Sequence, residues 1–228
     1  MARQLKRILK YGIGEILLVT VGILVALQIN NWNDQRKSRQ ELKTILATVQ
    51  NDLTTNMVEC DALIEHFNDE IKKLNLVFDS TTNEDTLRNC IECYTANVGF
   101  ADLVIKTRGL EMLHDFKSQH SVASDSLILL IDAFYTNLLR YNSTMSDLIN
   151  KDVLDNLKYY RDNYSWYEQL IAGNLTDEIR SEIRSNVFTR NRMYHYRVLV
   201  QSNYLRLLNS FKSQGQIILD RLEDLDKK

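Results

Sequence analysis

The chain has no proline in its 228 residues and only seven glycines. Proline breaks helices most strongly and glycine weakens them, so this scarcity leaves long helices uninterrupted. Few stretches alternate apolar and polar residues in the way that half-buried strands do. We therefore expect an all-α fold.

Cysteine is also scarce, with Cys60, Cys90 and Cys93 the only three. Cys90 and Cys93 have the spacing of a C-x-x-C redox motif, but the strand-to-helix context of a thioredoxin-like site is missing. A second C-x-x-C or a paired histidine, which would complete a zinc site, is missing too. In an oxidising periplasm two of the three can form a disulfide, with Cys90 and Cys93 as the candidates. A redox or hydrolytic enzyme that uses these two cysteines stays open as an alternative.

The short motifs of common enzymes and metal sites are missing. The four histidines form no H-x-x-x-H or H-E-x-x-H pair, and the chain has no G-x-S-x-G motif and no glycine-rich phosphate loop. We therefore expect no catalytic residue, no metal and no cofactor.

The chain has no excess of positive charge, since its net charge is −2 at pH 7. Residues 1–32 hold four basic residues and one acidic residue, which leaves a net charge of −5 on residues 33–228. A nucleic-acid partner would favour a basic surface, so we expect none.

A long apolar stretch is present at the start of the chain. From Tyr11 to Trp32 the only charged residue is Glu15. As a helix this stretch would be about 33 Å long, enough for a bilayer core of about 30 Å. Basic residues precede it, and Trp32 lies at its far edge, as is typical of a membrane-spanning helix.

This pattern predicts a cytoplasmic tail at 1–10, a transmembrane helix at 11–32 and an extracytoplasmic domain at 33–228, placed in the periplasm by the basic start. The difference in positive charge between the two sides of the span is modest, because basic residues also follow it. A cleaved signal peptide would have a similar start, but small residues are missing at the usual cleavage spacing. A buried core helix is a further alternative, although the stretch is apolar around nearly its whole circumference.

One face of this helix is smaller and more polar than the rest. Gly22 and Ala26 have the small-x-x-x-small spacing that lets helices approach closely. The face predicts self-association of the span, and it consists of Gly12, Glu15, Val19, Gly22, Ala26 and Asn30. In one interpretation Glu15 faces a partner helix, and a narrower version of it is a channel-like assembly lined by Glu15. In the other, Glu15 reaches the lipid headgroups or Lys10.

Apolar spacing of three and four residues predicts the remaining helices. One helix continues from the span to about Phe78 and ends in the polar residues 79–83. Shorter helices follow at 84–96 and at 100–116, the latter with Gly109 as a kink or corner. After a polar loop at 117–121, a long helix with Ser124 as N-cap runs to about Tyr164. A helix capped by Thr176 and a last long helix after Asn186 complete an expected elongated antiparallel helical bundle.

Two polar or aromatic clusters are candidate binding surfaces. The first cluster consists of Arg190, Arg192, His195 and Arg197. It could bind an acidic ligand or a lipid headgroup, or its residues could pair with Asp177, Glu178 and Glu182. The second cluster consists of Tyr159, Tyr160, Tyr164, Trp166 and Tyr167. We expect it to form either a binding surface or the packed end of a bundle.

The opening run from Ile13 to Asn33, IGEILLVTVGILVALQINNWN, resembles an uncharacterised Bacteroidota family of short single-pass inner-membrane proteins. Residues 105–110 (IKTRGL) and 188–197 (FTRNRMYHYR) resemble the same family. The resemblance implies an inner-membrane helical protein. It implies no activity and no catalytic residue.

Together these patterns predict a non-enzymatic, single-pass envelope protein that binds other proteins or itself. Its expected partners are membrane lipid and either a second copy or another envelope protein. The alternative is an oligomeric sensor or channel-like assembly with Glu15 in the interface.

Overall fold

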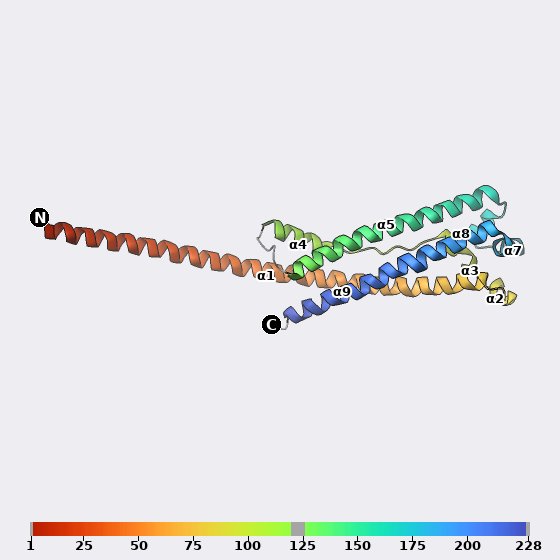
Figure 1. The fold of residues 1–228 in the computed structure, drawn as a ribbon, viewed down its shortest axis with the longest axis horizontal. Helices are drawn as coiled ribbons and strands as arrows, with labels where there is room; N and C mark the ends of the chain where they lie inside the picture. Colours follow the sequence, from red (N-terminus) through yellow and green to blue (C-terminus); the bar gives the residue numbers. More distant parts are fainter. Residues whose placement is uncertain (1, 120–125, 227–228) are drawn as a thin grey trace. The chain divides into compact units, whose positions relative to one another are not determined.

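The structure is a computed structural model that describes the backbone of residues 2–119 and 126–226 and the side chains of residues 17–118 and 126–225. Most of the described residues are helical and none forms a strand (Figure 1), which confirms the expected all-α class. The elements are α1 Ala2–Phe78, α2 Glu84–Arg88, α3 Glu92–Thr95, η1 Ala96–Val98, α4 Arg108–Gln119, α5 Ser126–Asn163, α6 Tyr167–Ile171, α7 Asp177–Ser185, α8 Val187–Val198, η2 Leu199–Tyr204 and α9 Leu205–Asp226.

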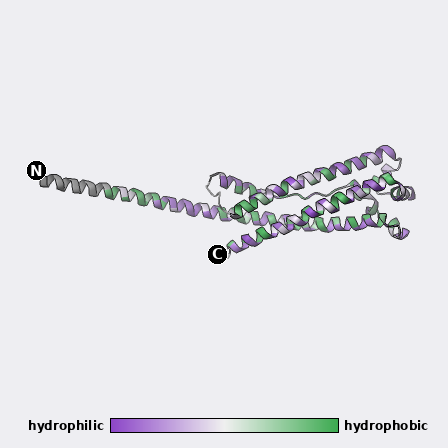
Figure 2. Cartoon of the chain, viewed as in Figure 1, coloured by the Kyte–Doolittle hydropathy of each residue, from purple (hydrophilic) through white to green (hydrophobic). Residues whose placement is uncertain are grey.

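The chain divides into two compact units, Met1–Thr48 and Val49–Lys228. The first unit is the opening part of α1, in which a green apolar stretch is followed by a purple polar one (Figure 2). Among the residues that the structure describes, no helix combines the length and the apolar character needed to cross a membrane. The side chains of residues 11–16 lie outside the described set. The transmembrane prediction for residues 11–32 therefore gains no support from the structure, and the expected boundary at residue 33 stays a prediction.

The second unit begins at Val49, and α1, α5 and α9 contribute to its core. α5 and α9 lie side by side and run in opposite directions (Figure 1). The ring of Phe134 on α5 stacks on that of Phe211 on α9, with 5.5 Å between centroids. The thiol of Cys60 on α1 donates a hydrogen bond to the carbonyl oxygen of Leu208 at 3.3 Å. These contacts bury the apolar stripes that the sequence predicts.

α1 ends at Phe78, where the sequence predicts its end. The carboxylate of Asp79 accepts hydrogen bonds from the backbone N–H and the hydroxyl of Thr81, at 2.8 and 2.7 Å. Asn83 then caps α2 by accepting from the N–H of Asp85 at 2.8 Å. Side chains that bond to nearby backbone groups in this way compete with helix continuation, which explains the turn.

The single helix expected at 84–96 is wrong, because the chain leaves the helix between Arg88 and Glu92. The side-chain amide of Asn89 donates to the carbonyl of Asp85 at 3.1 Å, and the N–H of Cys90 bonds to Leu87 at 3.3 Å. These bonds satisfy carbonyls at the end of α2 and tighten its last turn. The result is two short helices with Cys90 in the break between them.

The helix expected at 100–116 is wrong in its first half, because residues 99–107 form an extended segment. Asn56 exchanges two hydrogen bonds with the backbone of Lys106, at 3.0 and 2.8 Å. The hydroxyl of Tyr204 accepts from the N–H of Leu103 at 2.8 Å, and Asn142 donates to the carbonyl of Leu103 at 3.1 Å. Buried backbone groups need partners, and here buried polar side chains supply them in place of a helix.

Gly109 lies in the first turn of α4 and serves close packing rather than a kink within a helix. A Cβ atom at this position would lie 2.6 Å from the backbone of Val49 on α1. The carboxylate of Asp52 accepts from the N–H of Gly109 at 2.7 Å. Only glycine permits this approach of two helix backbones.

The later helices begin and end close to the predicted positions. α5 runs from Ser126 to Asn163, and the expected N-cap at Ser124 lies outside the described residues. The expected polar loop at 117–121 begins later, because α4 continues to Gln119. Thr176 caps α7 as predicted, accepting from the N–H of Ile179 at 3.3 Å.

The last helix contains an inserted π-helical segment, η2, that the sequence reading missed. Tyr194 on α8 is half exposed, so it does not belong to the buried stripe of this helix. From Tyr196 to Leu208 the fully buried residues follow steps of four: Tyr196, Val200, Tyr204 and Leu208. In an α-helix each such step drifts by about 40° around the axis. The wider turn of η2, in which the N–H of Leu205 bonds to Val200, reduces this drift and keeps the stripe on the core.

Candidate functional site

The most distinctive surface of the first unit is a run of exposed apolar side chains on α1. Nine large apolar residues here are between 50% and 77% exposed. They are Leu17, Leu18, Val19, Val21, Ile23, Leu24, Val25, Leu27 and Ile29. A contiguous apolar surface of this kind is typical of sites that contact lipid or another protein.

The predicted self-association face belongs to this surface. Val19 and Ala26 are exposed, and a Cβ atom on Gly22 would meet no other atom within 4 Å. The side chain of Asn30 donates to the carboxylate of Asp34 at 3.2 Å. Gly12 and Glu15 lie outside the residues whose side chains are described. The described part of this face is therefore open in the single chain.

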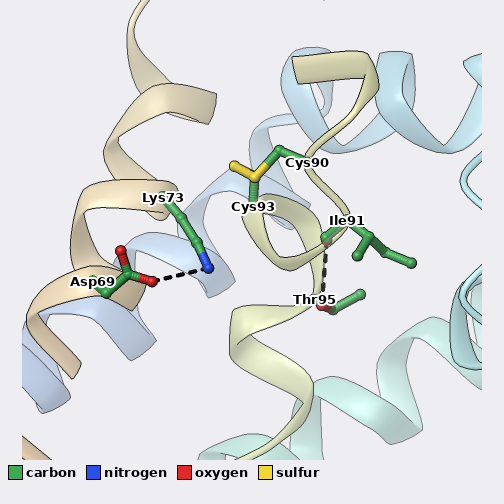
Figure 3. The surroundings of a disulfide bond; sticks show 6 residues. All are labelled: Asp69, Lys73, Cys90, Ile91, Cys93 and Thr95. Atoms are coloured by element: carbon green, nitrogen blue, oxygen red, sulfur yellow. Dashed lines mark hydrogen bonds and ion pairs between the residues drawn. A yellow bond between two sulfur atoms is a disulfide. The ribbon is translucent and has the colours of Figure 1, made fainter. Parts of the chain in front are cut away.

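Cys90 and Cys93 are joined by a disulfide bond (Figure 3). Cys93 is fully buried, whereas Cys90 is half-buried in the break after α2. Nearby, Lys73 pairs with Asp69 at 2.9 Å, and the hydroxyl of Thr95 donates to the carbonyl of Ile91 at 3.3 Å (Figure 3). A reductant can therefore approach this disulfide through Cys90.

Cys60 is free and fully buried among the helices of the second unit. Burial raises the pKa of its thiol to about 12, and the charge of Asp61 adds to this rise. A thiol with such a pKa stays protonated at neutral pH and is a poor nucleophile. Cys60 is a core residue.

The predicted cluster on α8 is divided between two neighbours. Arg190 and Arg197 lie over the ring of Phe78 at the end of α1, at 5.7 and 5.5 Å from its centroid. Arg192 and His195 belong to the other part, which contacts α5.

On the α5 side, the guanidinium of Arg192 lies 4.0 Å from the centroid of the Tyr159 ring. It also donates to the side-chain oxygen of Asn156 at 3.1 Å. His195 lies 3.8 Å from the carboxylate of Asp152. The four residues therefore do not converge on one ligand site.

Two of the three acids proposed to pair with this cluster have partners outside it. Asp177 pairs with Arg180 at 2.7 Å, and this bond lowers the pKa of the Asp177 carboxyl. Glu182 accepts from the side-chain amide of Asn186 at 2.5 Å. These acids secure α7 and the start of α8.

The aromatic cluster at 159–167 packs largely against itself. Tyr160 and Trp166 are buried, and the rings of Tyr164 and Trp166 stack with 4.5 Å between centroids. The hydroxyl of Tyr164 lies 3.1 Å from that of Thr189 on α8. This arrangement fits the packing interpretation of the cluster.

Glu70 is a residue that the sequence reading missed. It lines a cavity of about 350 Å³ together with His66, Lys73 and Glu92. Burial raises the pKa of its carboxyl to about 7, although the hydroxyl of Tyr196 donates to it at 3.0 Å. Glu70 and Tyr196 are 126 residues apart, so no local pattern brings them together.

A family model described as "Family of unknown function (DUF6090)" matches residues 15–97, from α1 to η1. The comparisons with curated proteins and with solved structures found no match. The chain is thus similar over this region to an uncharacterised domain, and this similarity names no substrate or partner.

Proposed function

We propose that this chain is a membrane-anchored helical-bundle protein that acts by self-association or by binding another envelope protein, without a catalytic step. The observation that carries the proposal is the exposed apolar run at residues 17–29 of α1. The anchor would be residues 11–32, with the basic tail in the cytoplasm and the main domain in the periplasm.

Exposure of this run to water would be costly. Covering apolar surface is worth roughly 25 cal/mol per Å², and nine large side chains of α1 are at least half exposed. Lipid tails would cover all sides of the helix at once. Trp32, which is also mostly exposed, is a residue type that favours the membrane–water interface.

Self-association is supported by the open face around Gly22. In a bilayer, helices associate through close packing of small residues rather than through the hydrophobic effect. Gly22 has free space around its Cα in the single chain, so a larger side chain there would not disturb the protomer. It would, however, keep a second helix at a distance.

Crosslinking of the full-length protein in native membranes tests the proposal. We expect a crosslinked species in the unmodified protein and its loss in Gly22→Ile. Leu24→Ile is the matched control. Leu24 is exposed on the other side of the helix, and isoleucine has the same side-chain volume as leucine. A protein that yields only monomer, or a Gly22→Ile variant that crosslinks like the parent, would contradict self-association.

A further inference from the structure

A second, larger cavity lies in the second unit where the end of α1 meets α2, α7 and the start of α8. Its volume is about 750 Å³. Four arginines from three helices line it: Arg88, Arg180, Arg184 and Arg190. A cavity of this size is in the range of small-molecule sites.

Two of the four guanidinium groups are paired with acids that also line the cavity. Arg180 pairs with Asp177 at 2.7 Å, and Arg184 pairs with Glu84. Arg180 also donates to the carbonyl of Leu175 at 2.8 Å. Both arginines are mostly buried, so their positions are fixed by the fold.

The other two guanidinium groups form no ion pair with a described residue, although Arg88 lies close enough to Asp177 for its charge to lower the pKa of that carboxyl. Arg190 donates to the backbone carbonyl of Arg184 at 2.9 Å and lies over the ring of Phe78, which orients it. Arg88 is exposed and makes no hydrogen bond or ion pair with a described residue. The lining of the cavity therefore carries two positive charges more than negative ones.

A buried hydroxyl lies close to the same charges. Tyr94 is 1% exposed, and its hydroxyl has no hydrogen-bond partner among the described residues. Burial raises the pKa of Tyr94, while the nearby charges of Arg184 and Arg180 oppose this rise. Tyr94 does not line the cavity, so its hydroxyl does not contact a ligand bound there.

We propose that this cavity binds a small organic dianion with two carboxylate groups, one held by Arg88 of α2 and the other by Arg190 of α8. Guanidinium groups bind planar carboxylates through two parallel hydrogen bonds. The cavity already contains two guanidinium–carboxylate pairs, Arg180 with Asp177 and Arg184 with Glu84. The two unpaired arginines come from different helices, which favours a ligand with two separated anionic groups over a single small anion.

This inference goes beyond the proposed function, and its test is independent of membrane attachment. Isothermal titration of the full-length protein in detergent uses succinate as the probe, with glutarate as a longer dicarboxylate and inorganic phosphate as a single anion. We expect saturable binding of succinate or glutarate that is weaker at high salt. Phosphate should bind at least about tenfold more weakly, because it engages only one of the two arginines.

The deciding variant is Arg88→Gln, because Arg88 is exposed and its loss removes no hydrogen bond or ion pair with a described residue. We expect it to weaken dicarboxylate binding about tenfold or more, the effect of one lost charge-assisted pair. Arg206→Gln removes the same charge from the exposed surface of α9 and should leave binding unchanged. Arg190→Gln should weaken binding as much as Arg88→Gln does, with its fold checked by circular dichroism.

Absence of saturable dicarboxylate binding would overturn the proposal, and so would equal binding by Arg88→Gln and the parent. Phosphate that binds as tightly as the dicarboxylates would overturn the two-group assignment. Any of these results leaves the membrane crosslinking unaffected, so failure of this inference is distinguishable from failure of the proposed function.

Discussion

At the scale of single residues, the three cysteines differ in how accessible their sulfur atoms are. Cys90 and Cys93 are joined to each other, and Cys60 is buried with a pKa raised to about 12. Maleimide labelling of the folded protein should therefore modify no cysteine, and labelling after mild reduction should modify Cys90 first. Labelling in denaturant after reduction should modify all three. The measurement is mass spectrometry of the intact protein, and rapid labelling of Cys60 in the folded state would contradict the packing described for α1 and α9.

Glu70 gives a prediction about pH. Its folded pKa is about 7, above the 4.5 of an unperturbed glutamate, because burial disfavours the charged carboxylate. Between these two values the folded state binds more protons than the unfolded state, so this group makes stability fall as pH rises. Glu70→Gln, which is neutral at every pH and retains an acceptor for Tyr196, removes this dependence.

We expect Glu70→Gln to be more stable than the parent near pH 8, on the order of 2 kcal/mol. The difference should shrink through the window from about 7 down to 4.5 and vanish below it. Urea unfolding followed by circular dichroism at several pH values measures the free energy of unfolding. If the stability difference between Glu70→Gln and the parent did not change with pH, Glu70 would be ionised in the folded state between pH 4.5 and about 7.

At the scale of elements, Gly109 holds α4 against α1. Gly109→Ala places a Cβ atom 2.6 Å from backbone atoms of Val49, which cannot move as a side chain can. We expect a loss of about 3 kcal/mol or more in the free energy of unfolding. Gly99→Ala is the matched control, since a Cβ there meets no atom within 4 Å, and it should change stability by less than about 1 kcal/mol. Thermal unfolding of both variants measures the effect, and equal stability of the two would refute the close packing of α4 on α1.

Apolar spacing predicted the long helices because each of them buries one stripe. The end of α1 at Phe78 and the cap at Thr176 also follow from local residues. The extended segment at 99–107 does not, because its backbone partners come from residues such as Asn56 and Tyr204, far away in sequence. The π-helical segment η2 was missed for a related reason, since the steps of four in its sequence could equally belong to an ordinary helix.

For the candidate sites, too, the sequence predicted contacts between near neighbours in the chain but not contacts between distant residues. The spacing of Cys90 and Cys93 made them the candidates for a disulfide, because they are neighbours along the chain. The arginines of α8 looked like one cluster in sequence, yet Arg190 joins Arg88 at a cavity whereas Arg192 contacts α5. A helix directs successive residues to different sides, so density in sequence alone does not define a site.

At the scale of the whole molecule, the chain combines an exposed apolar segment with a helical domain that carries a charged cavity. The apolar run at residues 17–29 distinguishes the first unit from the second, which buries most of its large apolar side chains. The proposed anchor would keep the domain and its cavity at the membrane, and association through Gly22 would bring several copies together. Neither role requires a catalytic group.

Extraction of cell membranes with alkaline carbonate tests the central claim, membrane anchoring, most directly. This wash removes proteins held at the surface and leaves proteins with a segment embedded in lipid. We expect the full-length chain to stay in the membrane pellet and to be released only by detergent. Release of the intact chain into the carbonate supernatant would contradict it.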